Sequence, residues 1–229
     1  MDYKTLAKLY NSQANFYDLS RFGSRAGKYA AKIEEKYILN LLKVRGKILE
    51  VGCGTGKFAK LAKNGYYVGI DIAPSMLEVA RNKHEQSSWL LMNGEELGFR
   101  SNTFDAILVV RVFKFFKNPK KFLSEARRVL KEGGNLIILY ENRDVIWRRR
   151  KLISKFGEKY YSTKEMESML TTCGFKIYFH KKVALSPHVL SKYIPDLLNL
   201  VLLKISQKLS ISFLYTNSII VGELHDASA

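Results

Sequence analysis

Residues 49–58, LEVGCGTGKF, decide the fold of this chain of 229 residues. The stretch opens with the apolar and β-branched character of a strand that is buried on both faces of a sheet. Gly52, Gly54 and Gly56 follow, and a glycine turn lets the backbone lie against a ligand because no Cβ stands in the way. A helical pattern after the glycines would aim a helix N-terminus at that ligand. The stretch therefore predicts a nucleotide-cofactor site between a strand and a helix.

The glycine spacing does not fit a phosphate-binding Walker loop. That motif has a glycine five residues before its Gly-Lys pair and a Ser or Thr after it, whereas Val51 and Phe58 occupy these two positions. Phosphate binding of that kind is not expected here.

A second apolar run, residues 67–72 (YVGIDI), contains the carboxylate of Asp71. Side chains at the carboxyl ends of neighbouring parallel strands meet in one crevice, so we expect Asp71 to face the ribose of the cofactor. An acid about twenty residues after a glycine turn is common to ribose-binding α/β folds, dinucleotide enzymes included. Asp71 alone does not distinguish among them, and the discrimination comes from Glu50, just ahead of the glycines, and from motifs further along the chain.

Ordered motifs at family spacing give the chain its resemblance to a known family. Residues 50–56 (EVGCGTG) resemble the first motif of the class I S-adenosylmethionine-dependent methyltransferases, in the group related to the quinone and sterol C-methyltransferases. Residues 69–77 (GIDIAPSML) resemble the motif of their second strand, and residues 93–99 (NGEELGF) their adenine loop, which usually reads Asp-Ala-Glu-x-Leu-Pro-Phe. Residues 104–119 resemble their fourth strand with its loop, and residues 126–134 (ARRVLKEGG) the helix before their fifth strand.

The resemblance implies the fold, the cofactor and the organisation of the chain. The expected fold is α/β, a single Rossmann-like class I methyltransferase domain over residues 1–229, with a mostly parallel seven-stranded sheet, an antiparallel last strand and helices on both faces. The expected cofactor is S-adenosylmethionine. The expected segments are an N-terminal helical segment (1–45), a cofactor-binding core (46–184), a helical lid-like insertion (185–214) and the last strand with the tail (215–229).

The resemblance also assigns roles to residues. The backbone from Gly52 to Gly56 is expected to face the methionine and ribose parts, and Glu50 to orient the methionine amino group. Tyr10 and Tyr17 are expected to close the site from the N-terminal segment. The full set of expected cofactor-binding residues is Glu50, Gly52, Cys53, Gly54, Gly56, Asp71, Ile72, Met76, Asn93, Gly94, Glu95, Val110, Arg111 and Tyr17.

The chain departs from the family pattern at three places. Asn93 replaces the usual Asp, but its amide oxygen can still accept a hydrogen bond from the adenine amino group. Gly98 replaces Pro. Lys114 and Phe115 stand where many relatives carry a His-His pair, which argues against histidine-based proton transfer there.

Composition limits the possible architectures. With 47% hydrophobic residues, the chain is long enough for one α/β domain and short for two. Two cysteines predict neither a disulfide framework nor a metal site, and a reducing cytoplasm is the expected compartment. The start of the chain does not read as a signal segment, and the longest apolar run, residues 197–203, is far below the ~20 residues that a membrane span needs.

The net charge of +17 is the compositional outlier. It can reflect a lysine-rich, solvated surface. The alternative uses its distribution, because basic residues cluster on two loops at the expected substrate edge of the sheet, and this predicts an anionic partner such as phosphate, a lipid headgroup or nucleic acid. These residues are Lys114, Lys117, Lys120 and Lys121 in one loop and Arg148, Arg149, Arg150 and Lys151 in the other.

Local patterns predict the remaining elements. Residues 28 to 43 have helical spacing, and Ser162 with Glu165 forms a capping box for a helix that ends near Gly174. Residues 185–214 carry a helical apolar stripe that predicts either a helix packed on the core or a lid meeting a lipid-like acceptor or the membrane periphery. The other expected elements are a helix from Asn118-Pro119 to Gly133-Gly134 and strands over residues 136–140, 175–179 and 218–222.

The chemistry follows from the expected cofactor. A sulfonium methyl group is already electrophilic, so the enzyme must chiefly hold the acceptor in line and exclude water. No catalytic residue is assigned, and the candidates for a general base are His180, His188, Tyr140 and Glu141. The Asp/Asn-Pro-Pro-aromatic signature of amino-group methylation and the Pro-Cys nucleophile of cytosine C5 enzymes are both missing from the sequence.

The predicted function is methyl transfer from S-adenosylmethionine to a small-molecule or lipid-like acceptor, with an anionic acceptor as one option. An RNA methyltransferase is the alternative that would explain the charge, although no separate RNA-binding module is visible. A noncatalytic S-adenosylmethionine-binding protein is the third reading, and the intact glycine turn and Asp71 argue against it.

Overall fold

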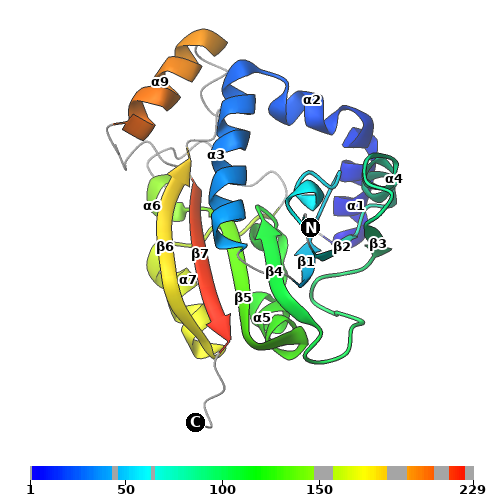
Figure 1. Cartoon of the computed structure of the whole chain (residues 1–229). Helices are drawn as coiled ribbons and strands as arrows, with labels where there is room; N and C mark the ends of the chain where they lie inside the picture. The colour runs from blue at the N-terminus through cyan, green and yellow to red at the C-terminus, as the bar shows by residue number, and fades with distance from the viewer. Residues whose placement is uncertain are drawn as a thin grey trace.

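The computed structural model describes residues 2–42, 46–62, 65–146, 157–184, 195–208 and 217–224. Its seven-stranded sheet has the order β3-β2-β1-β4-β5-β7-β6 (Figure 1). All neighbouring strands are parallel except β7, which is antiparallel to both β5 and β6. The predicted sheet, with its antiparallel last strand, is confirmed. The strands are β1 (Lys47–Val51), β2 (Tyr66–Asp71), β3 (Ser88–Leu91), β4 (Phe104–Val110), β5 (Leu130–Glu141), β6 (Phe175–Ala184) and β7 (Asn217–Leu224).

Helices cover both faces of the sheet, as predicted. On one face, α5 and α7 bury Phe122 and Met166 against the β4 and β5 side chains Val109 and Ile138. On the other face, Ile38 of α3 packs with Leu108 and its neighbours, and α4 packs beside it over β1 and β2. Each large apolar side chain buried in these layers contributes about 1.5–3 kcal/mol to folding.

The described helices fall before, between and after the strands. They are α1 (Tyr3–Gln13), η1 (Ala14–Phe16), α2 (Tyr17–Phe22), α3 (Arg25–Leu41), η2 (Ala59–Leu61), α4 (Pro74–Lys83), η3 (Phe113–Phe115), α5 (Pro119–Val129), α6 (Arg143–Ile146), α7 (Thr163–Thr172) and α9 (Asp196–Lys208).

Side-chain caps begin several of these helices where the sequence predicts them. Ser24 caps α3 by accepting the N–H of Gly27, so the helix starts a little before the predicted residue 28. Asn118 caps α5 by accepting the N–H of Lys121. The predicted capping box at the start of α7 is present, and Gly174 follows that helix with a φ of 85°.

The fifth strand is longer than predicted. Helix α5 ends at Val129, and β5 begins at the next residue and runs to Glu141, so it includes the glycines expected to stop the helix. The pairing of β5 with β4 shifts register between Phe104 and Ala106, and Gly133 has a φ of 69°. The glycines therefore allow an irregularity within a strand, and the predicted residues 136–140 form its regular part.

The prediction of an α-helix directly after the glycine turn is wrong. Among the described residues, only the short η2 lies between Gly56 and β2. This η2 is a single 3₁₀ turn of 3 residues, so no α-helix follows the glycine turn within the described residues 57–62.

Helix α9 is the described part of the predicted insertion, and the rest of residues 185–214 lies outside the described ranges. It packs on α3 through Leu203 against Ala26 (Figure 1), and Gln207 donates a hydrogen bond to the Val183 carbonyl of β6. The Asp196 carboxylate fixes this position by accepting the N–H groups of Arg25 and Ala26 at 2.8 and 3.1 Å. The two predicted roles, a packed helix and a lid, stay predictions. None of the helices in the described ranges combines the length and hydropathy required to cross a bilayer.

Replacing Ser162 with Ala should lower the free energy of unfolding by about 1 kcal/mol, because it removes the acceptor for the Glu165 N–H at the start of α7. Urea unfolding followed by circular dichroism measures the change, with Ser162→Thr as the control that keeps a capping hydroxyl. Equal losses in the two variants would contradict a role for the cap.

Candidate functional site

The candidate site lies where β1, β2 and β4 end. These strands are neighbours and parallel, so their carboxyl ends meet at one edge of the sheet. The loop after β1 places Gly52, Gly54 and Gly56 in the left-handed region, with φ values of 69°, 53° and 74°. The N–H groups of Gly52 and Cys53 are satisfied by the Ile70 carbonyl of β2, at 2.8 and 3.0 Å. The glycine turn predicted from the sequence is therefore held against the next strand.

The three glycines differ in what surrounds them. A Cβ on Gly52 would collide with the side chain of Val112, and one on Gly56 would lie 2.6 Å from the ring of Trp89. A Cβ on Gly54 would have no heavy atom within 4 Å. The outer glycines therefore allow close packing of the protein itself, whereas the middle one borders open space in the pocket.

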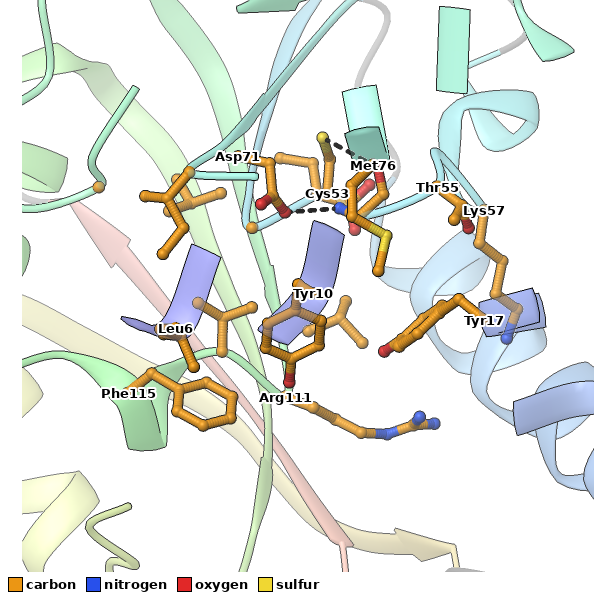
Figure 2. Close-up of a pocket in the computed structure, with 18 of the residues that line it drawn as sticks. Leu6, Tyr10, Tyr17, Cys53, Thr55, Lys57, Asp71, Met76, Arg111 and Phe115 are labelled. Carbon is orange, nitrogen blue, oxygen red and sulfur yellow. Dashed lines mark hydrogen bonds between the residues drawn. The ribbon is translucent and has the colours of Figure 1, made fainter. Parts of the chain in front are cut away.

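The pocket beside this turn holds about 1010 Å³ of space between side chains, part of it open to solvent. Residues from all three strand ends, from the loop after β3 and from α1 and α2 line it (Figure 2).

Asp71 connects the glycine loop after β1 to the loop that leads from β2 into α4. Its carboxylate accepts the N–H of Gly54 and the N–H of Ala73, both at 2.9 Å (Figure 2 shows the first bond). Burial raises the pKa of Asp71, and the backbone hydrogen bonds oppose that shift. Each oxygen keeps a further lone pair, so the carboxylate can still accept hydrogen bonds from a ligand.

Glu50 is a second carboxylate in the pocket wall, and it is 1% exposed. The hydroxyl of Tyr67 donates a hydrogen bond to it. Burial raises the pKa of Glu50 to about 8, although the Tyr67 hydroxyl and the charge of Lys57 act against this. A cation bound beside Glu50 would restore its charged form.

The loop after β3 supplies another part of the pocket wall. Asn93 and Gly94 line the pocket, with Ile72, Met76 and Met92 as apolar neighbours. The side-chain oxygen of Asn93 accepts the N–H of Glu95 at 3.1 Å, which fixes its orientation.

Glu95 is not among the lining residues. Its carboxylate accepts the Tyr3 hydroxyl and the N–H of Asn118 at 2.9 Å, so it ties α1 to the start of α5. Its predicted contact with the cofactor stays a prediction.

Helices α1 and α2 form a roof over the pocket. Tyr10 meets Tyr17 edge-on at 6.1 Å and Phe115 at 6.0 Å between ring centroids (Figure 2). Tyr10 and Tyr17, which the sequence predicts to close the site, both line the pocket. The roof residues are Tyr3, Leu6, Tyr10, Tyr17, Arg21 and Phe22.

Polar contacts hold the roof in place. Asn11 accepts the N–H of Ser75 at 2.9 Å, at the start of α4. Asp18 accepts the Thr55 hydroxyl at 2.6 Å and pairs with Lys83. The roof is thus tied to α4 and to the glycine loop.

The end of β4 carries a strained residue. Arg111 has a φ of 58°, a conformation that costs a side-chain-bearing residue about 1–3 kcal/mol and that concentrates at functional sites. Its N–H donates to the Leu139 carbonyl at 2.7 Å, and its guanidinium pairs with the buried Glu34 of α3. Both Val110 and Arg111 line the pocket, as the sequence predicts.

The candidate general bases lie elsewhere. Tyr140 and His180 are hydrogen-bonded to each other at 3.0 Å, and His180 is bonded in turn to Glu167 at 2.7 Å. Glu141 pairs with Lys114 at 2.8 Å. None of these residues is among those lining the pocket, and His188 lies outside the described residues.

The structure brings most of the predicted site residues together. The lining includes Glu50, Gly52, Cys53, Gly54, Asp71, Ile72, Met76, Asn93, Gly94, Val110, Arg111 and Tyr17, whereas Gly56 packs against Trp89 behind the loop. The sequence did not predict several further lining residues, which come from the N-terminal helices, the glycine loop and the loops after β3 and β4. These are Tyr3, Leu6, Arg21, Phe22, Thr55, Lys57, Phe58, Met92, Val112, Phe115 and Phe116. The spacing of seven between Tyr3, Tyr10 and Tyr17, two helical turns each, is a signal that could have found the roof.

Comparison with known proteins agrees with this geometry. The family "Methyltransferase domain" matches residues 49–138. An uncharacterized protein of Methanocaldococcus jannaschii is 38% identical over 138 residues, 58% of this chain and 65% of that protein. The demethylmenaquinone methyltransferase of Tropheryma whipplei (strain Twist) is 37% identical over 160 residues, 57% of this chain and 66% of that enzyme. The matches thus span just under two thirds of the length of these two relatives.

A solved structure extends the likeness to nearly the whole chain. The S-adenosylmethionine-dependent methyltransferase of Thermotoga maritima superposes with a TM-score of 0.67 at 20% identity, covering 96% of this chain and 98% of that one. At this identity the likeness concerns the fold. Residues 49–138 therefore belong to the family of methyltransferase domains, and the chain as a whole has the fold of an S-adenosylmethionine-dependent methyltransferase.

Proposed function

We propose that the protein transfers a methyl group from S-adenosylmethionine to a small-molecule or lipid-like acceptor in the pocket under α1 and α2. The observation that carries this proposal is the open space beside Gly54, next to the buried carboxylate of Glu50 and the partly buried carboxylate of Asp71 at the ends of β1 and β2. S-adenosylmethionine is the cofactor of the family, and its hydroxyls and ammonium group need acceptors of this kind.

The residues present fit this cofactor. Asp71 has lone pairs left for the ribose hydroxyls, and Glu50 offers a buried carboxylate to the methionine ammonium group. Ile72 and Met76 suit the flat face of adenine, and Asn93 can read its edge. Cys53, Gly94, Val110 and Tyr17 complete the proposed binding set.

The cofactor, when bound, supplies an electrophilic methyl group. The residues of the chain then hold the acceptor and exclude water, which competes with it. Tyr10, Tyr17 and Phe115 suit this role because their rings cover the pocket. Tyr140 and His180 bond to each other away from the lining, so the proposed transfer depends on positioning rather than on those bases.

The aromatic walls support a flat, apolar acceptor. Rings from α1, α2 and η3 surround the space, and stacked or edge-on rings favour another planar group. The Tropheryma whipplei relative is named for a quinone, demethylmenaquinone, which is a lipid-like acceptor of this kind. Both cysteines are free thiols, which fits the reducing cytoplasm proposed as the compartment, with the membrane periphery as the alternative for a lipid acceptor.

An RNA methyltransferase is the second candidate, and the net charge of +17 favours it. The basic run Arg148, Arg149, Arg150 and Lys151, predicted to contact an anionic surface or RNA, lies outside the described residues. Of the other predicted cluster, Lys114 is partly buried and forms ion pairs with Glu141 and Glu158, so its charge is already compensated.

A screen with methyl-labelled cofactor identifies the acceptor class. Cell extract incubated with the protein and labelled S-adenosylmethionine should carry protein-dependent label in its small-molecule or lipid fraction, because the pocket is roofed. The Gly54→Val variant serves as the inactive control. Label confined to RNA would overturn the proposed acceptor in favour of the second candidate.

Glu50 predicts proton release when the cofactor binds. With a pKa of about 8, Glu50 is mostly protonated at pH 7 in the free protein, and a bound ammonium group favours its charged form. Binding of S-adenosylhomocysteine should therefore release most of one proton more from the wild type than from Glu50→Gln. Wild-type affinity should rise with pH up to about 8 by more than that of the variant.

Calorimetry in two buffers of different ionisation enthalpy measures that proton count. The ligand amine titrates in both proteins, so the difference between them isolates Glu50. Identical proton counts for wild type and Glu50→Gln would show that Glu50 does not face the bound amine.

Gly54→Val should abolish cofactor binding without unfolding the protein. The branched side chain would fill the space in which the backbone meets the cofactor, and affinity should fall at least about tenfold. Gly133→Val is the matched control, since Gly133 also has a positive φ and its Cβ would meet only Glu223 at 3.9 Å. If calorimetry shows equal affinity for both variants, the glycine turn is not the cofactor site.

A further inference from the structure

Three cationic side chains line the pocket. Arg21 comes from α2, Lys57 from the residue after the glycine turn, and Arg111 from the end of β4. Figure 2 shows Lys57 and Arg111 among the lining side chains. The charge of Lys57 acts on Glu50, so this cationic wall borders the proposed cofactor contacts.

Arg21 has no carboxylate partner among the described residues. Its guanidinium lies 5.7 Å from the ring centroid of Tyr17, and its Nε is buried without a hydrogen-bond partner. The charge of Glu141 acts on Arg21, but no carboxylate in the described ranges lies within ion-pair distance of it. A partly buried cation without a close counter-charge suits a site that an anion completes.

Lys57 and Arg111 share one buried carboxylate. Arg111 pairs with Glu34 directly, and the Lys57 ammonium lies 3.9 Å from the same carboxylate. Glu35 is also 3.9 Å from Lys57 but pairs more closely with Lys60, at 3.0 Å. Within ion-pair distance Glu34 is thus shared by two cations, and the other carboxylates that act on them, Glu50 on Lys57 and Glu141 on Arg111, form no ion pair with either.

Two further observations show that this charge is under-compensated. The Nζ of Lys57 and the Nε of Arg111 are buried and have no hydrogen-bond partner. Burial lowers the pKa of Lys57 to about 8, since the favourable charges of Glu34 and Glu35 are opposed by Arg111 and Lys60. The strained φ of Arg111 persists although relaxing it would be favourable, which is typical of a residue held for function.

We propose that Arg21, Lys57 and Arg111 form a subsite for a carboxylate or phosphate group of the methyl acceptor. This inference rests on the proposed function and narrows it, because it makes the acceptor an organic acid with an apolar, planar part. Guanidinium groups suit such oxyanions since they donate paired hydrogen bonds to two oxygens. The aromatic rings of the roof would cover the rest of the acceptor.

The cofactor also carries a carboxylate, so the test starts from protein saturated with S-adenosylhomocysteine. Benzoate and phenyl phosphate are the probes, and benzamide is the neutral analogue of the same shape. At least one anionic probe should bind about tenfold more tightly than benzamide, as expected for charge-assisted hydrogen bonds in a buried site. Ligand-observed NMR titration measures the affinities, and the stronger probe shows which acid the subsite prefers.

Arg21→Gln is the main variant, because Arg21 is in no ion pair among the described residues. Replacing Lys57 or Arg111 would instead remove a partner of the Glu34 carboxylate. It should lose most of the preference for the anionic probe while its affinity for S-adenosylhomocysteine stays within about threefold of wild type. Arg100→Gln, an exposed arginine outside the lining, should keep both affinities. Circular dichroism confirms that each variant is folded.

Three outcomes would overturn the subsite. They are equal binding of the anionic probes and benzamide, binding of the anionic probe to the free protein but not to protein saturated with S-adenosylhomocysteine, and loss of S-adenosylhomocysteine affinity in Arg21→Gln. The second and third would assign the cations to the carboxylate of the cofactor. If S-adenosylhomocysteine itself fails to bind the wild type, the proposed function fails, and this result is distinct from failure of the subsite alone.

Discussion

The carboxylate of Asp71 is the contact on which the pocket depends. It lies at the end of β2 and binds the backbone of two loops, one that leaves β1 and one that leads into α4. A partly buried carboxylate left without hydrogen bonds is costly, so these two N–H groups fix the Asp71 side chain as it fixes the two loops. The position of Gly54, the start of α4 and the floor of the pocket follow from this arrangement.

Local signals predicted those parts of the fold that neighbouring residues determine. Ser162 and Glu165 act on each other across one helical turn, and Asn118 acts on the N–H of Lys121, so each cap could be identified from spacing alone. The segment after Gly56 could not, because Phe58 and Ala59 pack into clusters with side chains from several strands. Contacts between residues far apart in the sequence leave no local pattern.

The same division holds for the site. Glu50, Asp71 and Asn93 lie at strand ends inside motifs, and the sequence placed them at one crevice correctly. Arg21 and Lys57 belong to no motif, and only the packing of α2 over the glycine loop brings them to the pocket. Glu95 is the reverse case, since it lies in a motif but holds α1 and α5 instead of lining the pocket.

The construction of the roof has a consequence for the exchange of ligands. Helix α1 buries only Leu6, η1 only Ala14, and α2 no residue fully, so polar contacts at Asn11 and Asp18 hold the roof more than apolar burial does. Segments with few buried apolar contacts open at a lower free energy than the sheet below them. The roof can therefore lift while the seven strands stay folded, and the frequency of that opening sets an upper limit on how fast a spent cofactor leaves and a fresh one enters.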